Sequence, residues 1–252
     1  MRIYLGTLAT ALALCSSALA QHSEALRVYS SNGVRVVLQE MLPQIEEAIG
    51  RNLVFEFSTS RTLTDRIAAN EAFDVAILTP SLIDELSALQ KILPGSQTEF
   101  AQVGIGVGSR AGAPARSVGT LDELRQTFLE AESIAFGANG QSRRTNEASF
   151  EALGIADEMR NKIRLTGAGE APVLVAEGEI DLVLTLVSEL LREPGVQFLG
   201  PFPPEIQGYV HFVAGVSASA SDPDATEAFV SYLSAPAFIA SLEKHGLGPV
   251  SP

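Results

Sequence analysis

The sequence predicts an α/β protein with mainly parallel sheets, and three observations support this. Short apolar runs typical of buried strands alternate with segments whose apolar residues recur at helical spacing. Nearly every such strand precedes a helix, an order that favours parallel pairing with helices on both faces of a sheet. A chain of 252 residues, or 232 after removal of the first 20 (252 minus 20), has room for two small lobes.

The first part of the chain contains repeated strand–helix units. Residues 34–49 carry apolar side chains at helical spacing, and Gly50 follows them as a typical helix terminator. The predicted units are a strand at 26–29 with a helix at 34–49, a strand at 52–57 with a helix at 61–70, and a strand at 73–78 with a helix at 81–89. These units predict the sheet of a first lobe.

Two apolar strands are predicted to connect this lobe to a second one. Residues 103–107 lead outward into a Gly- and Pro-containing loop, and residues 209–216 lead back. Between them we expect helices at 121–131, 143–153 and 170–178, and strands at 134–136, 163–166, 181–187 and 196–199. Helices at 224–233 and 236–245 close the chain. The expected lobes are 21–105 with 212–252, and 106–211.

The N-terminus has the features of a secretory signal peptide. Arg2 precedes an apolar stretch at 5–14 that is too short to span a bilayer, and Ala18 and Ala20 form a small-x-small cleavage site. The only cysteine, Cys15, falls inside this signal. We therefore expect cleavage after Ala20 and a mature chain without disulfides in a bacterial periplasm.

Charge excludes two classes of partner. Without Arg2 the chain has 16 basic and 30 acidic residues, a net charge of −14, which disfavours nucleic acid and anionic membranes. After the signal there is no further apolar segment long enough to insert into a membrane. The histidines lack metal-ligand spacing, and no nucleotide-binding or nucleophile motif occurs, so no metal and no cofactor are expected.

The loop at 137–146 is the strongest sequence signal for a binding site. It joins a predicted strand to a predicted helix, with Ser142 as the expected N-cap, so free backbone N–H groups would face a ligand. Arg143 and Arg144 in the first helical turn oppose the helix dipole unless an anion lies nearby. The alternative that both arginines point into water remains open from the residues alone.

An ordered set of segments resembles the periplasmic solute-binding proteins similar to the molybdate-binding protein, a family that also includes an aconitate isomerase. The segments are SSNGVRVVLQEMLPQIEEAIG (30–50), STSRTLTDRI (58–67), FDVAIL (73–78), GVGSRAGAP (106–114), NGQSRRTNEASFEALGI (139–155), VAEGEIDLVLTLVSELL (175–191) and FVSYLSAPAFIASLEKHGL (229–247). The resemblance implies a two-lobed type II periplasmic-binding-protein fold with a cleft between mainly parallel sheets joined by two crossing strands.

The resemblance also implies where ligand contacts lie, at loops that follow strands in both lobes. Carried over by position, these contacts are Ser30, Ser31, Asn32, Ser58, Thr59 and Ser60 in the first lobe, and Gln141, Ser142, Arg143, Arg144, Thr145, Thr185, Leu186 and Ser188 in the second. Arg61 stands next to the first set. Serine, threonine and asparagine at these positions are equally suited to capping the helices that follow.

One departure from the family pattern bears on the ligand. In GEIDLVLTL (178–186), Leu186 stands where molybdate binders have a tyrosine that contacts the oxyanion. Arg61, Arg143 and Arg144 instead offer guanidinium groups, which match carboxylates in two-pronged geometry. We therefore expect an organic di- or tricarboxylate in preference to molybdate.

Two functions of different classes remain open. The favoured one is capture of this anion for a membrane permease of an ABC-type transporter, as the resemblance implies. The alternative is a cofactor-independent isomerase of a tricarboxylate such as aconitate, which needs a general base beside an acidic C–H bond. Glu147, Glu189 and His211 are candidate bases, with Glu170 a further one, and none is singled out by its spacing.

Overall fold

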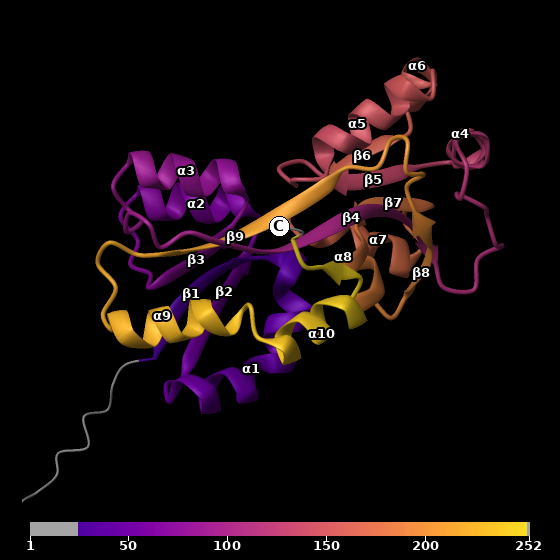
Figure 1. Cartoon of the computed structure of the whole chain (residues 1–252). Helices are drawn as coiled ribbons and strands as arrows, with labels where there is room; N and C mark the ends of the chain where they lie inside the picture. The colour runs from indigo at the N-terminus through magenta and orange to yellow at the C-terminus, as the bar shows by residue number, and fades with distance from the viewer. Residues whose placement is uncertain (1–24, 251–252) are drawn as a thin grey trace, which may run out of the picture.

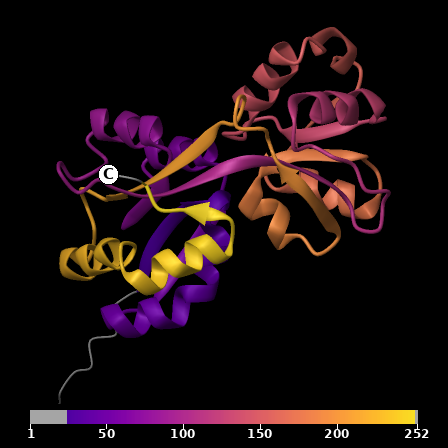
Figure 2. The ribbon, with the colours of Figure 1, turned by 45° about the vertical axis from the view of Figure 1, so that its right-hand side comes forward.

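The computed structural model describes residues 25–250, so the predicted signal peptide lies outside the described residues. Figures 1 and 2 show two lobes joined by two long strands, β4 and β9. Each lobe is a sheet with helices on both faces. Between residues 25 and 250, no helix is both long enough and apolar enough to cross a membrane.

Lobe 1 contains a parallel three-stranded core. Its strands are β1 (Leu26–Ser31), β2 (Leu53–Ser58) and β3 (Val75–Leu78), in the order β2-β1-β3, with β9 (Tyr209–Val216) antiparallel to β3. Its helices are η1 (Asn32–Val34), α1 (Arg35–Ile49), α2 (Ser60–Ala68), α3 (Pro80–Ala88), α9 (Pro223–Tyr232) and α10 (Pro236–Lys244). Helices α2 and α3 cover one face, and α1, α9 and α10 the other (Figure 1).

Lobe 2 has a similar plan with a mixed sheet. Strand β5 (Ile134–Gly137) lies between β6 (Ile163–Thr166) and β7 (Leu182–Leu186), parallel to both, and β8 (Val196–Pro201) pairs with β4. Its helices are α4 (Leu121–Glu130), α5 (Arg143–Ala152), α6 (Ala156–Met159), α7 (Glu170–Glu177) and α8 (Val187–Arg192). A core that includes Phe128, Phe136 and Phe150 holds this sheet to α4 and α5.

The connection between the lobes depends on β4 (Thr98–Arg110). Its first half pairs antiparallel with β9, and from Ile105 onward it pairs with β7 instead. The change of partner falls next to the expected boundary at 105/106. The pairing of β9 begins at Tyr209, ahead of the expected return point at 211/212. The short strand β10 (Leu247–Gly248) also pairs with β4.

This arrangement brings strand ends from both lobes to one place. In lobe 1, β1 ends at Ser31 and β2 at Ser58, and helices begin directly afterwards. In lobe 2, β5, β6 and β7 end at Gly137, Thr166 and Leu186, each before a helix. Open α/β sheets bind ligands at the carboxyl ends of their strands, so the topology positions a site between the lobes.

Candidate functional site

A cavity of about 50 Å³ lies between the lobes, where these strand ends meet. Its walls are formed by residues that follow β1 and β2 in lobe 1 and β5, β6 and β7 in lobe 2. The lining residues are Ser31, Asn32, Thr59, Ser60, Gly137, Gly140, Gln141, Ser142, Gly167, Ala168, Gly169, Ala171, Pro172, Thr185, Leu186 and Glu189. They are neutral apart from one carboxyl group, that of Glu189.

Helix N-termini make up most of this lining. The starts of η1, α2, α5, α7 and α8 all contribute residues to it. The starts of α5, α7 and α8 have no side-chain cap, and Ser142, at the expected N-cap position of α5, makes no capping hydrogen bond. Uncapped first-turn N–H groups and the positive ends of the helix dipoles favour an anion in the cavity.

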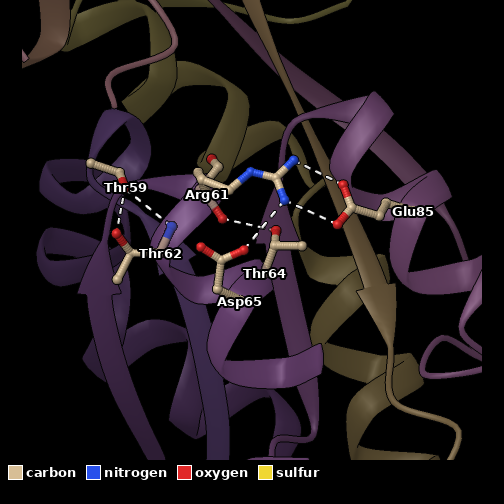
Figure 3. Close-up of polar contacts among 7 residues, drawn as sticks. Thr59, Arg61, Thr62, Thr64, Asp65 and Glu85 are labelled. Atoms are coloured by element: carbon tan, nitrogen blue, oxygen red, sulfur yellow. Dashed lines mark hydrogen bonds and ion pairs between the residues drawn. The ribbon is translucent and has the colours of Figure 1, made fainter. Parts of the chain in front are cut away.

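Lobe 1 adds polar side chains with unused hydrogen-bonding capacity. Thr59 caps α2 by accepting from the Thr62 backbone N–H at 3.2 Å (Figure 3). The hydroxyl oxygen of Ser60 is fully buried and has no hydrogen-bond partner among residues 25–250, and the same holds for Oδ1 of Asn32. A buried polar atom without a partner is costly, and a ligand in the cavity would satisfy it.

The lobes touch beside the cavity. Ser188 on α8 donates its hydroxyl hydrogen to the carbonyl oxygen of Gly33 at 2.6 Å, which ties lobe 2 to lobe 1. A Cβ at Gly33 would collide with Phe212 and lie 2.7 Å from Leu186. The glycine therefore allows the close approach of the two lobes at this point.

Glu189 lines the cavity and has a raised pKa. Its Oε2 accepts a hydrogen bond from the Thr185 hydroxyl at 2.5 Å, which fixes the carboxyl group at the cavity wall. Burial raises the pKa of Glu189, and the Thr185 hydrogen bond and the charge of Arg192 only partly oppose this. A carboxyl with a raised pKa accepts and returns protons more readily near neutral pH, as a general base must.

The structure does not bring the predicted arginines into this cavity. The Arg61 guanidinium binds both carboxylate oxygens of Glu85, at 3.0 and 2.8 Å, and also contacts Asp65 (Figure 3). Arg143 binds Glu147 and the carbonyl oxygen of Ala138, both at 2.8 Å.

Other predicted contacts also lie away from the cavity. Arg144 and Thr145 line a separate surface groove next to Gly208. Ser30 is buried in β1 and donates to the Ser31 carbonyl oxygen, and Ser58 is half-buried without lining the cavity. Arg61 and Arg143 already have carboxylate partners, and neither they nor Arg144 line the cavity, so contact of these arginines with the anion stays a prediction.

Glu189 is the one candidate base among the cavity-lining residues. Glu147 is exposed and engaged by Arg143, and His211 pairs with Glu99 at 2.6 Å on the exposed side of the crossing strands. Glu170 accepts a hydrogen bond from the Gly167 backbone N–H at 2.7 Å. Within residues 25–250 no cluster of histidine, cysteine or acidic side chains is placed to hold a metal ion.

The sequence reasoning missed the small residues of the lining. Gly167, Ala168 and Gly169 connect β6 to α7, and Gly169 has the left-handed φ of 72° that favours glycine. Ala171 and Pro172 follow in the first turn of α7. The available signal was a Gly-x-Gly loop between a strand and a helix, the same pattern that points to anion binding elsewhere.

Comparison with known proteins places the chain among binding proteins. The sequence profile of a family described as bacterial extracellular solute-binding proteins matches residues 26–248. An aconitate isomerase from Pseudomonas sp is 29% identical over 247 residues, which covers 95% of this chain and 94% of that one.

Solved structures show the same architecture at low identity. The periplasmic molybdate-binding protein of Azotobacter vinelandii superimposes with a TM-score of 0.76 at 17% identity, covering 90% of this chain and 99% of that one. The sulfate-binding protein SubI from Mycobacterium tuberculosis H37Rv superimposes with a TM-score of 0.72 at 14% identity, covering 90% and 88%. The expected two-lobed type II periplasmic-binding-protein fold is thereby confirmed.

Proposed function

Because this chain belongs to the family of bacterial extracellular solute-binding proteins, we propose that it binds a small polycarboxylate anion between its lobes in the bacterial periplasm. The cavity offers hydroxyl groups and uncapped helix N-termini, which are donors suited to carboxylate oxygens. Molybdate is not favoured, because Leu186 contributes an apolar side chain where the molybdate binders resembled above have a tyrosine.

Within this class we propose the activity of an isomerase acting on a tricarboxylate of the aconitate type. The observation that carries the proposal is Glu189, a carboxyl group with a raised pKa at the wall of a cavity otherwise built for an anion. In a site that only binds anions, a carboxylate would repel the ligand. In a site for proton transfer, it supplies the base. The similarity to an aconitate isomerase over 95% of the chain supports the same function.

The proposed reaction is a proton shift along the substrate carbon chain. The Glu189 carboxylate takes a proton from the methylene carbon, and the electron pair of that C–H bond moves toward the neighbouring double bond. The resulting carbanion is delocalised onto a carboxylate, whose added negative charge the helix N-termini stabilise. The protonated Glu189 then returns a proton to the former vinyl carbon. The double bond has moved, and no atom or electron has been gained or lost.

A second candidate function is capture of the same anion for an ABC-type membrane permease. The family description and the contact between the lobes at Ser188 and Gly33 favour it, since binding proteins grip a ligand by contacts made from both lobes. Under this proposal Glu189 would have to be protonated when the ligand is bound.

Turnover separates the two candidates. Purified protein is incubated with cis-aconitate and, separately, with trans-aconitate, and ultraviolet absorbance is followed. The isomerase proposal predicts that both reactions approach the same mixture at a rate proportional to protein concentration. Binding of trans-aconitate by calorimetry without any conversion at high protein concentration would leave the capture function and remove the isomerase.

A further inference from the structure

Arg35 is a cation in an environment that does not neutralise it. It is the first residue of α1, where a positive charge opposes the helix dipole. Its Nε is buried and has no hydrogen-bond partner in the described part of the chain. Its guanidinium carbon lies 4.8 Å from the centre of the Phe57 ring, so a cation–π contact fixes the group in place.

Arg192 approaches Arg35 from the opposite lobe. Helix α8 packs against η1 and the start of α1, with the Ser188 hydroxyl bound to the Gly33 carbonyl. Arg192 follows Ser188 by one helical turn and therefore lies on the same side of α8. Burial lowers the pKa of Arg35, and the positive charge of Arg192 lowers it further.

Each of these two arginines follows a cavity-lining residue by three positions, Arg35 after Asn32 and Arg192 after Glu189. Phe57, on which Arg35 rests, precedes the cavity-lining Thr59 by two residues. Arg192 follows the cavity-lining Glu189 by one helical turn and interacts electrostatically with it.

Arg35 and Arg192 have no ion-pair partner among the described residues, unlike Arg61 and Arg143. Arg61 and Arg143 are each bound to a carboxylate. No acidic side chain within residues 25–250 forms an ion pair with Arg35 or Arg192. Two like charges from opposite lobes repel unless an anion lies between them.

The size of the cavity indicates where further carboxylates of a ligand must go. A water molecule needs roughly 10–15 Å³ of such space. A cavity of about 50 Å³ therefore holds only a few groups of that size. A tricarboxylate with one carboxylate held by the helix N-termini extends beyond these walls, and Arg35 and Arg192 lie within one helical turn of the lining residues Asn32 and Glu189.

We propose that Arg35 and Arg192 form a two-lobed clamp that binds a second carboxylate of the ligand. This inference rests on the proposed function, because it deepens the site for a polycarboxylate. The carboxylate bridges the two guanidinium groups, one from each lobe. The ligand thereby replaces the repulsion between the two cations with two charge-assisted hydrogen bonds. Ligands with a single carboxylate cannot use this clamp, which makes the pair a determinant of specificity for polycarboxylates.

The test measures trans-aconitate affinity by isothermal titration calorimetry for Arg35→Gln, Arg192→Gln and the double variant. Each single change is expected to weaken binding at least tenfold, since a hydrogen bond to a charged group is lost. The double variant should lose less than the product of the two single losses, because both arginines hold one carboxylate. Crotonate, a monocarboxylate of similar skeleton, should lose less than threefold in any variant.

Arg61→Gln and Arg143→Gln are matched controls, since each removes a guanidinium that a carboxylate already neutralises; both should stay within twofold of wild type. Melting temperatures without ligand report folding, and they should not fall in the Arg35 and Arg192 variants, because an unpaired charge is removed. Wild-type affinity for trans-aconitate in both single variants would overturn the clamp and leave the proposed function standing. No binding of trans-aconitate by the wild type would instead refute the proposed function and the clamp with it.

Discussion

The cavity-facing and outward-facing sides of the same helix starts differ in chemistry. At the start of α2, Ser60 faces the cavity with an unpartnered hydroxyl, while the adjacent Arg61 turns outward to Glu85 (Figure 3). At the start of α5, Ser142 lines the cavity, while Arg143 turns to Glu147. At these two helix starts a neutral serine lines the cavity, and the arginine that follows it is bound by a carboxylate outside. The comparison teaches that closeness in sequence does not place an arginine in a site, because a nearby carboxylate can bind its guanidinium elsewhere.

The largest expected effect is on kcat, and it distinguishes the carboxyl group of Glu189 at the cavity wall from that of Glu147 on the surface. Glu189→Gln keeps the size of the side chain and its capacity to accept from Thr185, but removes the base. We expect kcat for trans-aconitate to fall by roughly 10²- to 10⁴-fold, the range for loss of general acid–base catalysis. Glu147→Gln, on the exposed side of α5, should leave kcat unchanged. If both variants lost the same fraction of kcat, Glu189 would not be the base that transfers the proton.

An intermediate effect, on the affinity for trans-aconitate, is expected when serine hydroxyl groups at the end of β2 and the start of α2 are removed. Ser60→Ala removes a buried, unpartnered cavity hydroxyl, and trans-aconitate affinity should fall about tenfold, as for loss of one hydrogen bond to a charged group. Ser58→Ala changes a neighbouring serine that does not line the cavity, and affinity should stay within twofold. Calorimetry on both variants checks this. A larger loss of affinity in the Ser58 variant than in the Ser60 variant would show that the ligand binds outside this cavity.

The smallest effect concerns stability and its dependence on pH. Because burial raises the pKa of Glu189, the folded protein keeps this proton at pH values where the unfolded chain has released it. Wild-type stability is therefore lost as pH rises through the raised pKa, whereas Glu189→Gln avoids this loss. At pH 7.5 the variant should melt about 2–4 °C higher, the shift expected for about 1 kcal/mol in a chain of this size.

At about pH 4, close to the ordinary glutamate pKa, this difference should become small because Glu189 is mostly protonated in both states. Differential scanning calorimetry at the two pH values checks the sign. A variant that melts lower than wild type at pH 7.5 would show that ionised Glu189 stabilises the fold, contrary to its burial.

The sequence predicted the scaffold of the site better than its charges. Strand–helix alternation located the loops that supply Ser31, Asn32, Thr59, Ser60 and Gln141, because strand ends are local features. Ion pairing is not local. Nothing near Arg61 in the sequence indicates that Glu85, on the next helix, would bind it.

The same limit hid Arg35 and Arg192. The two residues belong to different lobes, and only the contact of α8 with η1 and α1 brings them together. Glu189 was one of several candidate bases until the structure placed it alone among them at the cavity wall. Its raised pKa depends on burial in the folded protein, which no local sequence pattern reports.

The most direct test of the central claim, that Glu189 transfers a proton to and from a carboxylate held between the lobes, is proton NMR of trans-aconitate in D₂O. Wild-type protein should convert it to cis-aconitate and introduce deuterium at the substrate carbons, and Glu189→Gln should do neither while still binding the substrate. Conversion at the wild-type rate by the Glu189→Gln variant, or none by wild-type protein that binds trans-aconitate, would contradict the account.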